Sequence, residues 1–154
     1  MTGTLWSLAL ALAIFIAVHM VPVVPGLRAA MINAWGKRVY RALFSILSLA
    51  GLVWIVFAHK DAPQILLWEG PDWFRLIPLA AMPLVLILLA TMPSDGIKKV
   101  TRHPLLWAIF LWATAHIPTN GDAASLMLFG AFALFALIDQ PLAAARTRRE
   151  EPED

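Results

Sequence analysis

The chain contains no cysteine and little charge: of its 154 residues, 14% are Asp, Glu, Lys or Arg. The absence of cysteine excludes disulfides, thiolate metal sites and cysteine nucleophiles. A soluble domain normally has about a quarter of its residues charged. The scarcity of charge therefore predicts a protein that exposes much of its surface to something other than water.

Hydrophobic residues make up 60% of the chain, and its mean hydropathy is +0.75. This composition predicts an integral membrane protein whose partner is the lipid bilayer. The sequence pI of about 9.4 does not call for a nucleic-acid partner. In a membrane protein, a basic excess usually lies in the cytoplasmic loops.

Five apolar runs reach or approach the roughly 20 residues that a helix needs to cross a bilayer. The runs are continuous rather than alternating, which favours helices over strands. The expected fold is an all-α integral membrane protein, a bundle of about five transmembrane helices. The runs cover residues 4–24, 39–58, 73–92, 104–117 (the shortest) and 123–138.

A further short helix is expected in the first loop, where apolar residues recur at helical spacing beside Arg28, Asn33 and Lys37. Such an amphipathic helix is expected to lie in the inner membrane interface. Residues 1–145 are expected to form a single transmembrane domain, and residues 146–154 a charged cytoplasmic tail. The apolar positions of the short helix are Leu27, Ala30, Met31, Ala34 and Trp35.

The twelve basic residues divide unevenly between the two sides of the predicted bundle. The side rich in Lys and Arg remains in the cytoplasm. The N-terminus is therefore expected outside and the C-terminus inside, in agreement with an odd number of spans. One side carries Arg28, Lys37, Arg38, Arg41, Lys98, Lys99, Arg102, Arg146, Arg148 and Arg149, and the other Lys60 and Arg75.

Turn residues separate the last two runs. Pro104 fits the first turn of a helix, where its missing N–H costs nothing. Asn120-Gly121 is a turn dipeptide, and Asp122 is a good N-cap for the helix that follows. The last two spans are therefore expected to form a tight helical hairpin.

The four histidines differ in their surroundings. His59 follows an apolar run beside charged residues and is expected to be solvated, whereas His103 can cap a helix or face lipid headgroups. His19 and His116 lie within apolar spans, where a polar side chain faces a partner or a cavity. One interpretation is a hydrogen bond between helices. The other is a ligand role.

Two neutral imidazoles inside a helix bundle are a common way to hold a haem iron. The anionic propionates of haem would need cations at a membrane face, and Arg41 and Arg102 are suitably placed for this. Trp112 lies one turn before His116 and can line a flat cofactor. The metal ligands predicted on this hypothesis are His19 and His116.

Several short motifs resemble the signature of the NnrU family, and the resemblance extends from His19 to about Asp139. They combine an Arg-His-Pro run, an Ala-His pair and a basic run ending in Phe-Ser. The residues are Val100-Thr101-Arg102-His103-Pro104, Trp112, Ala115-His116, Asn120-Gly121-Asp122 and, upstream, Gly36-Lys37-Arg38-Val39-Tyr40-Arg41-Ala42-Leu43-Phe44-Ser45.

The resemblance implies a multi-pass protein of the bacterial inner membrane, in a family named after genes associated with denitrification. A related plant branch comprises zeta-carotene cis–trans isomerases that use haem b held by histidines. By resemblance, His19 and His116 occupy the axial-ligand positions. The plant branch has a cysteine where this chain has Ala113. Thiolate exchange is therefore excluded here, and isomerase activity does not simply carry over.

Depth in the membrane points to a different ligand pair. At about 1.5 Å per residue, His116 lies about 20 Å from the inner end of its span, and His19 about 8 Å from the inner end of its own. Ligands of one iron need similar depths, which favours His103 as the partner of His19. Resemblance favours His116, and both pairings remain open at this point.

Three functions are consistent with the sequence. The leading hypothesis is a small inner-membrane haem-binding protein, redox-active and linked to nitrogen-oxide metabolism. The second is a haem-dependent cis–trans isomerase that acts on a carotenoid-like polyene. The third is a cofactor-free membrane scaffold whose histidines bond between helices.

Overall fold

The computed structural model describes residues 3–24, 26–92, 96 and 101–150, with the side chains of the last helix described as far as residue 145. The chain divides into two compact units, Met1–Pro63 and Gln64–Asp154. The single domain expected over residues 1–145 remains a prediction.

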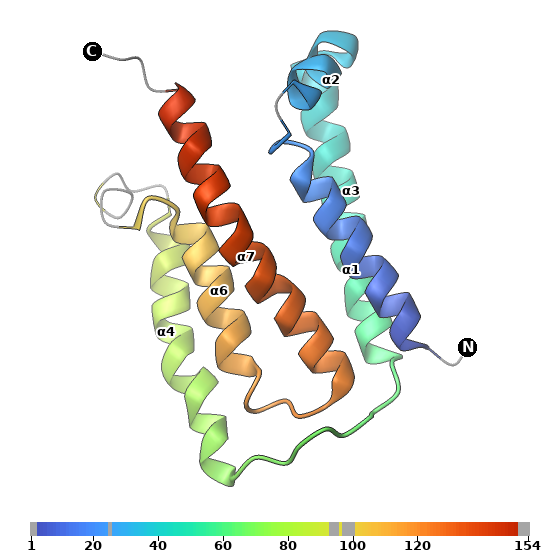
Figure 1. Ribbon diagram of the computed structural model, residues 1–154, viewed down its shortest axis with the longest axis vertical. Coiled ribbons are helices and arrows are strands. Elements are labelled where there is room, and N and C mark those ends of the chain that lie inside the picture. The colour runs from blue at the N-terminus through green and yellow to red at the C-terminus, as the bar shows by residue number, and fades with distance from the viewer. Residues whose placement is uncertain (1–2, 25, 93–95, 97–100, 151–154) are drawn as a thin grey trace. The chain divides into compact units, whose positions relative to one another are not determined.

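The first unit contains α1 (Leu5–Met20), α2 (Leu27–Trp35) and α3 (Lys37–Lys60), with α1 packed along α3 (Figure 1). Gly51 permits close packing, because a Cβ at this position would lie 3.2 Å from Cδ2 of Phe15. Small residues in apolar helices let two backbones approach in this way. The buried residues of the pair are Leu8, Ala11, Leu12, Tyr40, Gly51, Ile55 and Ala58.

A single glycine joins α2 to α3. Gly36 has φ 80° and ψ 153°, a conformation that glycine adopts without the cost of a Cβ. Its N–H donates to the Ile32 carbonyl at 2.8 Å, and its own carbonyl accepts from the Tyr40 N–H at 3.1 Å. The short helix expected from periodicity is therefore confirmed over Leu27–Trp35. It buries none of its residues within the unit.

The second unit contains a 3₁₀ turn, η1 (Asp72–Arg75), followed by α4 (Leu76–Ala90), α6 (Pro104–His116) and α7 (Ala123–Glu150). Helix α6 lies between α4 and α7 and packs against both (Figure 1). The hairpin expected from the last two apolar runs is confirmed as a pair of packed helices, α6 and α7. Its N-cap is also confirmed, since the Ser125 N–H donates to Oδ1 of Asp122 at 2.9 Å.

Hydrogen bonds join the segment before α4 to the turn between α6 and α7. The Trp68 N–H donates to the Gly121 carbonyl at 3.1 Å, and Trp68 Nε1 donates to the Pro118 carbonyl at 3.1 Å. The Thr119 hydroxyl donates to the Phe74 carbonyl at 3.0 Å. A Cβ on Gly121 would overlap the Trp68 carbonyl oxygen, so this turn needs glycine.

The expectation of an all-α fold is confirmed for the described part of the chain, but a count of about five spans is not. Three stretches are long and apolar enough to cross a membrane: Lys37–Lys60, Asp72–Ala90 and Ala123–Ala145. The other two apolar helices, α1 and α6, have 16 and 13 residues. Helix α1 ends before the predicted limit of its run because Pro22 and the turn around it cannot continue the helix.

Helix α7 extends beyond the predicted end of its run at residue 138. It contains Pro141 and continues to Glu150. The first five residues of the predicted tail, 146–150, are therefore helical, while residues 151–154 lie outside the described part. Pro141 removes a single backbone donor, and the helix continues past it.

Candidate functional site

His19 lies in the last turn of α1. Its Nδ1 is 2.8 Å from the carbonyl oxygen of Phe15, four residues earlier on the same helix. The ring centroid of His19 lies 4.1 Å from that of Phe15 and 5.4 Å from that of Phe44 on α3. The imidazole is therefore held between two phenylalanine rings and is partly buried.

His116, the last residue of α6, repeats this arrangement. Its Nδ1 is 2.7 Å from the carbonyl oxygen of Trp112, again four residues earlier. The ring stacks on Phe129 of α7 with centroids 5.0 Å apart and planes 23° apart. A stacked neighbour covers the face of an imidazole and not the nitrogens at its edge.

The two hydrogen bonds define the tautomer of both rings. A carbonyl oxygen only accepts, so Nδ1 must carry the hydrogen, and in a neutral imidazole the lone pair is then on Nε2. Histidines that bind metals usually donate from their second ring nitrogen to a carbonyl or carboxylate in this way. The chemistry of His19 and of His116 therefore fits side chains that would hold an iron through Nε2.

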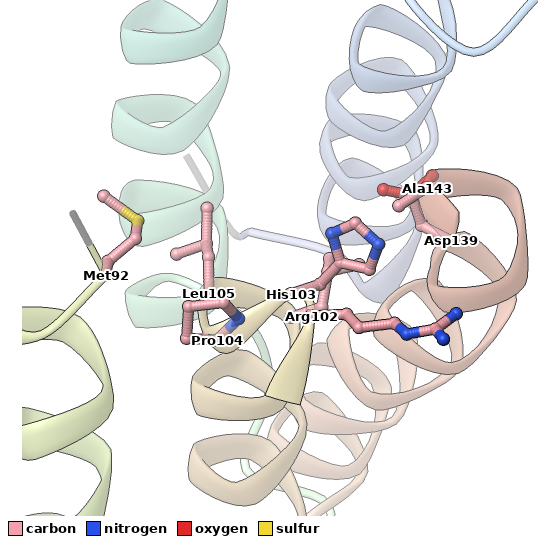
Figure 2. Close-up of a pocket in the computed structure, with 8 residues that line it drawn as sticks. Met92, Arg102, His103, Pro104, Leu105, Asp139 and Ala143 are labelled. Atoms are coloured by element: carbon pink, nitrogen blue, oxygen red, sulfur yellow. The ribbon is translucent and has the colours of Figure 1, made fainter. Parts of the chain in front are cut away.

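His103 is the N-cap residue of α6, but its side chain makes no capping hydrogen bond. Its ring lines an open pocket of about 300 Å³ instead, and Figure 2 shows it directed toward the turn of α7 that carries Asp139 and Ala143. The pocket is mostly apolar, and three of its lining residues are polar or charged. Its lining residues are Met92, Arg102, His103, Pro104, Leu105, Leu106, Asp139 and Ala143.

Two charged residues of opposite sign share this pocket. Arg102 is exposed and has φ 54°, in the left-handed region that side-chain-bearing residues rarely adopt. Asp139 of α7 is buried, with 8% of its surface exposed. Asp139 is not among the site residues predicted from the sequence. Its carboxyl group within an apolar helix could have indicated a functional role, because ionisable residues in membrane helices usually mark functional sites.

The remaining candidates divide between the two units. Trp112 packs between α6 and α7, with its ring centroid 5.1 Å from that of Phe129, and so lies beside His116. Arg41 is exposed near the start of α3. His59, expected in a solvated loop, is partly buried in the last turn of α3.

The structure does not bring His103 and His116 together. They lie at opposite ends of α6, thirteen residues or about 20 Å apart. Those two histidines therefore cannot share one iron. Within the described ranges, no three His, Asp or Glu side chains gather as a protein-built metal-ion site requires. An axial haem site takes only one or two ligands.

The fold and composition define a membrane protein built from apolar helices. The NnrU protein family model matches residues 7–154, and the chain therefore belongs to the NnrU family. This confirms the resemblance drawn from the Arg-His-Pro and Ala-His motifs. No curated protein and no solved structure matches the chain.

Proposed function

We propose that this NnrU-family protein is a small membrane haem protein that holds haem b between His19 and His116. The observation that carries the proposal is the matched pair of hydrogen bonds from Nδ1 to the carbonyl four residues earlier. Each bond prepares Nε2 as a ligand atom and restrains the ring before any ligand arrives. Haem b supplies a one-electron redox centre when bound.

Arg41 is the proposed partner of a haem propionate. It lies three residues before Phe44, on the same face of α3, and Phe44 contacts the His19 ring. A guanidinium pairs with a carboxylate through two parallel hydrogen bonds. Arg102 is the second candidate, but it shares its pocket with the carboxyl group of Asp139. A negative neighbour disfavours a further anion, so we assign the propionate to Arg41.

The proposed topology has five spans, with the N-terminus outside and the C-terminus in the cytoplasm. It rests on the ten-to-two division of basic residues. Helices α1 and α6 measure about 24 and 20 Å, so the residues flanking them must complete the crossing of a hydrocarbon core of about 30 Å. A cytoplasm-specific reporter fused after Asp154 should be active, and one inserted at Pro63 silent. The reverse pattern would overturn the orientation.

In this topology, His103 is an alternative to His116 as the second iron ligand. If each helix crosses once, the end of α1 and the start of α6 lie at the same membrane face, whereas the end of α6 lies at the other. Depth therefore favours a His19–His103 pair. The side-chain hydrogen bonding and the family resemblance favour His19–His116, which is the pair that we propose.

A visible absorption spectrum tests the haem proposal. The full chain, expressed with ample haem and purified in mild detergent, should show a Soret band and the spectrum of a low-spin, bis-imidazole haem. A correctly folded protein without a Soret band would leave the cofactor-free scaffold as the function. Conversion of a carotenoid-like polyene in reconstituted vesicles would support the isomerase. Its absence would favour an electron carrier, which is the role that the link with denitrification suggests.

A further inference from the structure

We propose that the pocket formed by the start of α6, α7 and the turn after α4 binds the headgroup of an aminophospholipid, a lipid whose headgroup carries both a phosphate and a primary ammonium group. The proposal is independent of haem. It rests on two residues of opposite sign, Arg102 and the buried Asp139, that line one cavity (Figure 2).

The charges in the pocket call for a zwitterion. Arg102 offers a guanidinium to a phosphate, a group that it recognises through paired hydrogen bonds. Asp139, on the α7 side, offers carboxylate oxygens to a donor or cation, and His103 lines the space beside them. A purely anionic headgroup would meet repulsion at Asp139. A headgroup with one positive and one negative group matches the charges of both residues.

The place of the pocket in the fold points to a lipid rather than a soluble ligand. It lies where α4 ends and α6 begins, and Asp139 lies about 24 Å along α7 from Ala123. This distance brings Asp139 close to the boundary of a hydrocarbon core of about 30 Å, where headgroups lie. The other five lining residues are apolar and would contact the first carbons of an acyl chain. They are Met92, Pro104, Leu105, Leu106 and Ala143.

The backbone of Arg102 gives independent support. Its φ of 54° is costly for a residue with a side chain, and such conformations cluster at ligand-binding positions. The conformation places the arginine directly before the N-cap of α6 and beside the cavity (Figure 2). A glycine would adopt it without cost but would contribute no cation.

Native mass spectrometry of the delipidated full chain tests the proposal. The protein is titrated separately with dioctanoyl phosphatidylethanolamine, phosphatidylcholine and phosphatidylglycerol. Phosphatidylethanolamine should bind at least about tenfold more tightly than the other two, because only its ammonium group can donate charge-assisted hydrogen bonds to Asp139. Free phosphoethanolamine should compete weakly, since it lacks the acyl chain.

Two variants locate the binding. Asp139→Asn should remove the preference for phosphatidylethanolamine over phosphatidylcholine, and Arg102→Gln should weaken the binding of all three lipids. The matched controls lie at the other end of the same unit, away from the pocket. Asp122→Asn retains an acceptor for the cap of α7, and Arg75→Gln alters an exposed ion pair; both should bind as the unchanged chain does.

Several results would overturn the proposal. They are equal binding of phosphatidylcholine, tighter binding of phosphatidylglycerol, equal binding of free phosphoethanolamine, or an unchanged preference in folded Asp139→Asn. Circular dichroism checks that each variant is folded. If Asp139→Asn does not fold, the exposed Arg102→Gln and the lipid preference of the unchanged chain still decide the question.

Discussion

The two units each hold a histidine ring in the same way, but with different neighbouring residues. Each places a histidine at the end of a short apolar helix, bonds its Nδ1 to the carbonyl four residues back, and sets the ring against a phenylalanine of a longer helix. In the first unit that phenylalanine is Phe44, and in the second it is Phe129. The same histidine conformation therefore occurs in two different helix pairs, because it depends mainly on the geometry of the histidine's own helix.

The difference lies in what fixes the turn after each histidine. The His116 carbonyl accepts from both the N–H and the side-chain amide of Asn120, at 3.1 and 2.8 Å. The following turn is also bonded to the segment before α4. His19 depends instead on the packing of α1 against α3, where Gly51 meets Phe15. One histidine is thus held mainly by polar contacts around its turn, and the other by close helix packing.

The largest expected effect comes from removing the histidines themselves. If the two units supply one ligand each, His19→Ala and His116→Ala should each abolish the low-spin haem spectrum, because a single imidazole leaves the iron with an open position. His103→Ala should leave the spectrum nearly unchanged. Folded yield is measured beside each spectrum.

An exchange of outcomes between His103 and His116 would show that depth decides the pairing. His116→Met sharpens this test, because a thioether still ligates haem iron and raises its reduction potential. An unchanged spectrum and potential in both His116 variants would return His116 to a hydrogen-bonded role between helices.

The next largest effect is expected from disturbing the close helix packing that holds His19. Gly51→Val should destabilise the first unit by roughly 1–3 kcal/mol, because overpacking a tight contact forces side chains or backbone to move. Phe15 is the group that must move, so the ligand position of His19 should be disturbed as well. Thermal unfolding and haem retention measure the two effects.

Gly130 of α7 is the matched control, because a Cβ there meets nothing within 4 Å. Gly130→Val should leave both the unfolding temperature and haem retention close to those of the unchanged chain. Equal losses in the two variants would show that glycine in a helix, rather than the contact with Phe15, is what matters.

Much of this comparison could be predicted from the sequence, because apolar runs, prolines and caps are local signals. The helix at Leu27–Trp35, the hairpin of α6 and α7, and the cap at Asp122 all follow from nearby residues. The lengths of α1 and α7 could not be predicted in this way, since hydropathy does not distinguish a turn residue from a helical one. Pro22 ends one helix, whereas Pro141 lies inside another.

The candidate site was less predictable. The hydrogen bonds of His19 and His116 are local and follow from placing any histidine in a helix with its ring toward the preceding turn. The pocket of Arg102 and Asp139 joins residues 37 positions apart in the sequence, and only the packing of α6 on α7 reveals it. The phenylalanine neighbours likewise depend on the register of helix pairs, which apolar patterning leaves open.

A smaller effect is expected from the proposed propionate contact. Arg41→Lys keeps the charge but loses the bidentate geometry. The loss of one charge-assisted hydrogen bond should weaken haem retention several-fold rather than abolish it. Dissociation of haem to an excess of apomyoglobin measures this. If Arg102→Lys weakens retention and Arg41→Lys does not, the propionate belongs to the second unit.

The smallest effect tests the polar contacts that distinguish the second unit. Trp68→Phe removes the donor at Nε1 and leaves most of the ring, so the Pro118 carbonyl loses its 3.1 Å partner. The net loss of such a bond is typically about 1 kcal/mol, and somewhat more where water cannot replace the donor. The unfolding temperature should fall by a few degrees. Haem retention should fall only slightly, because Asn120 still holds the His116 carbonyl. Trp73→Phe is the matched control, since the Trp73 side chain is largely exposed. If both tryptophan variants behave alike, the turn after His116 is no better held than the turn after His19, and the contrast between the two units would reduce to their different helix neighbours.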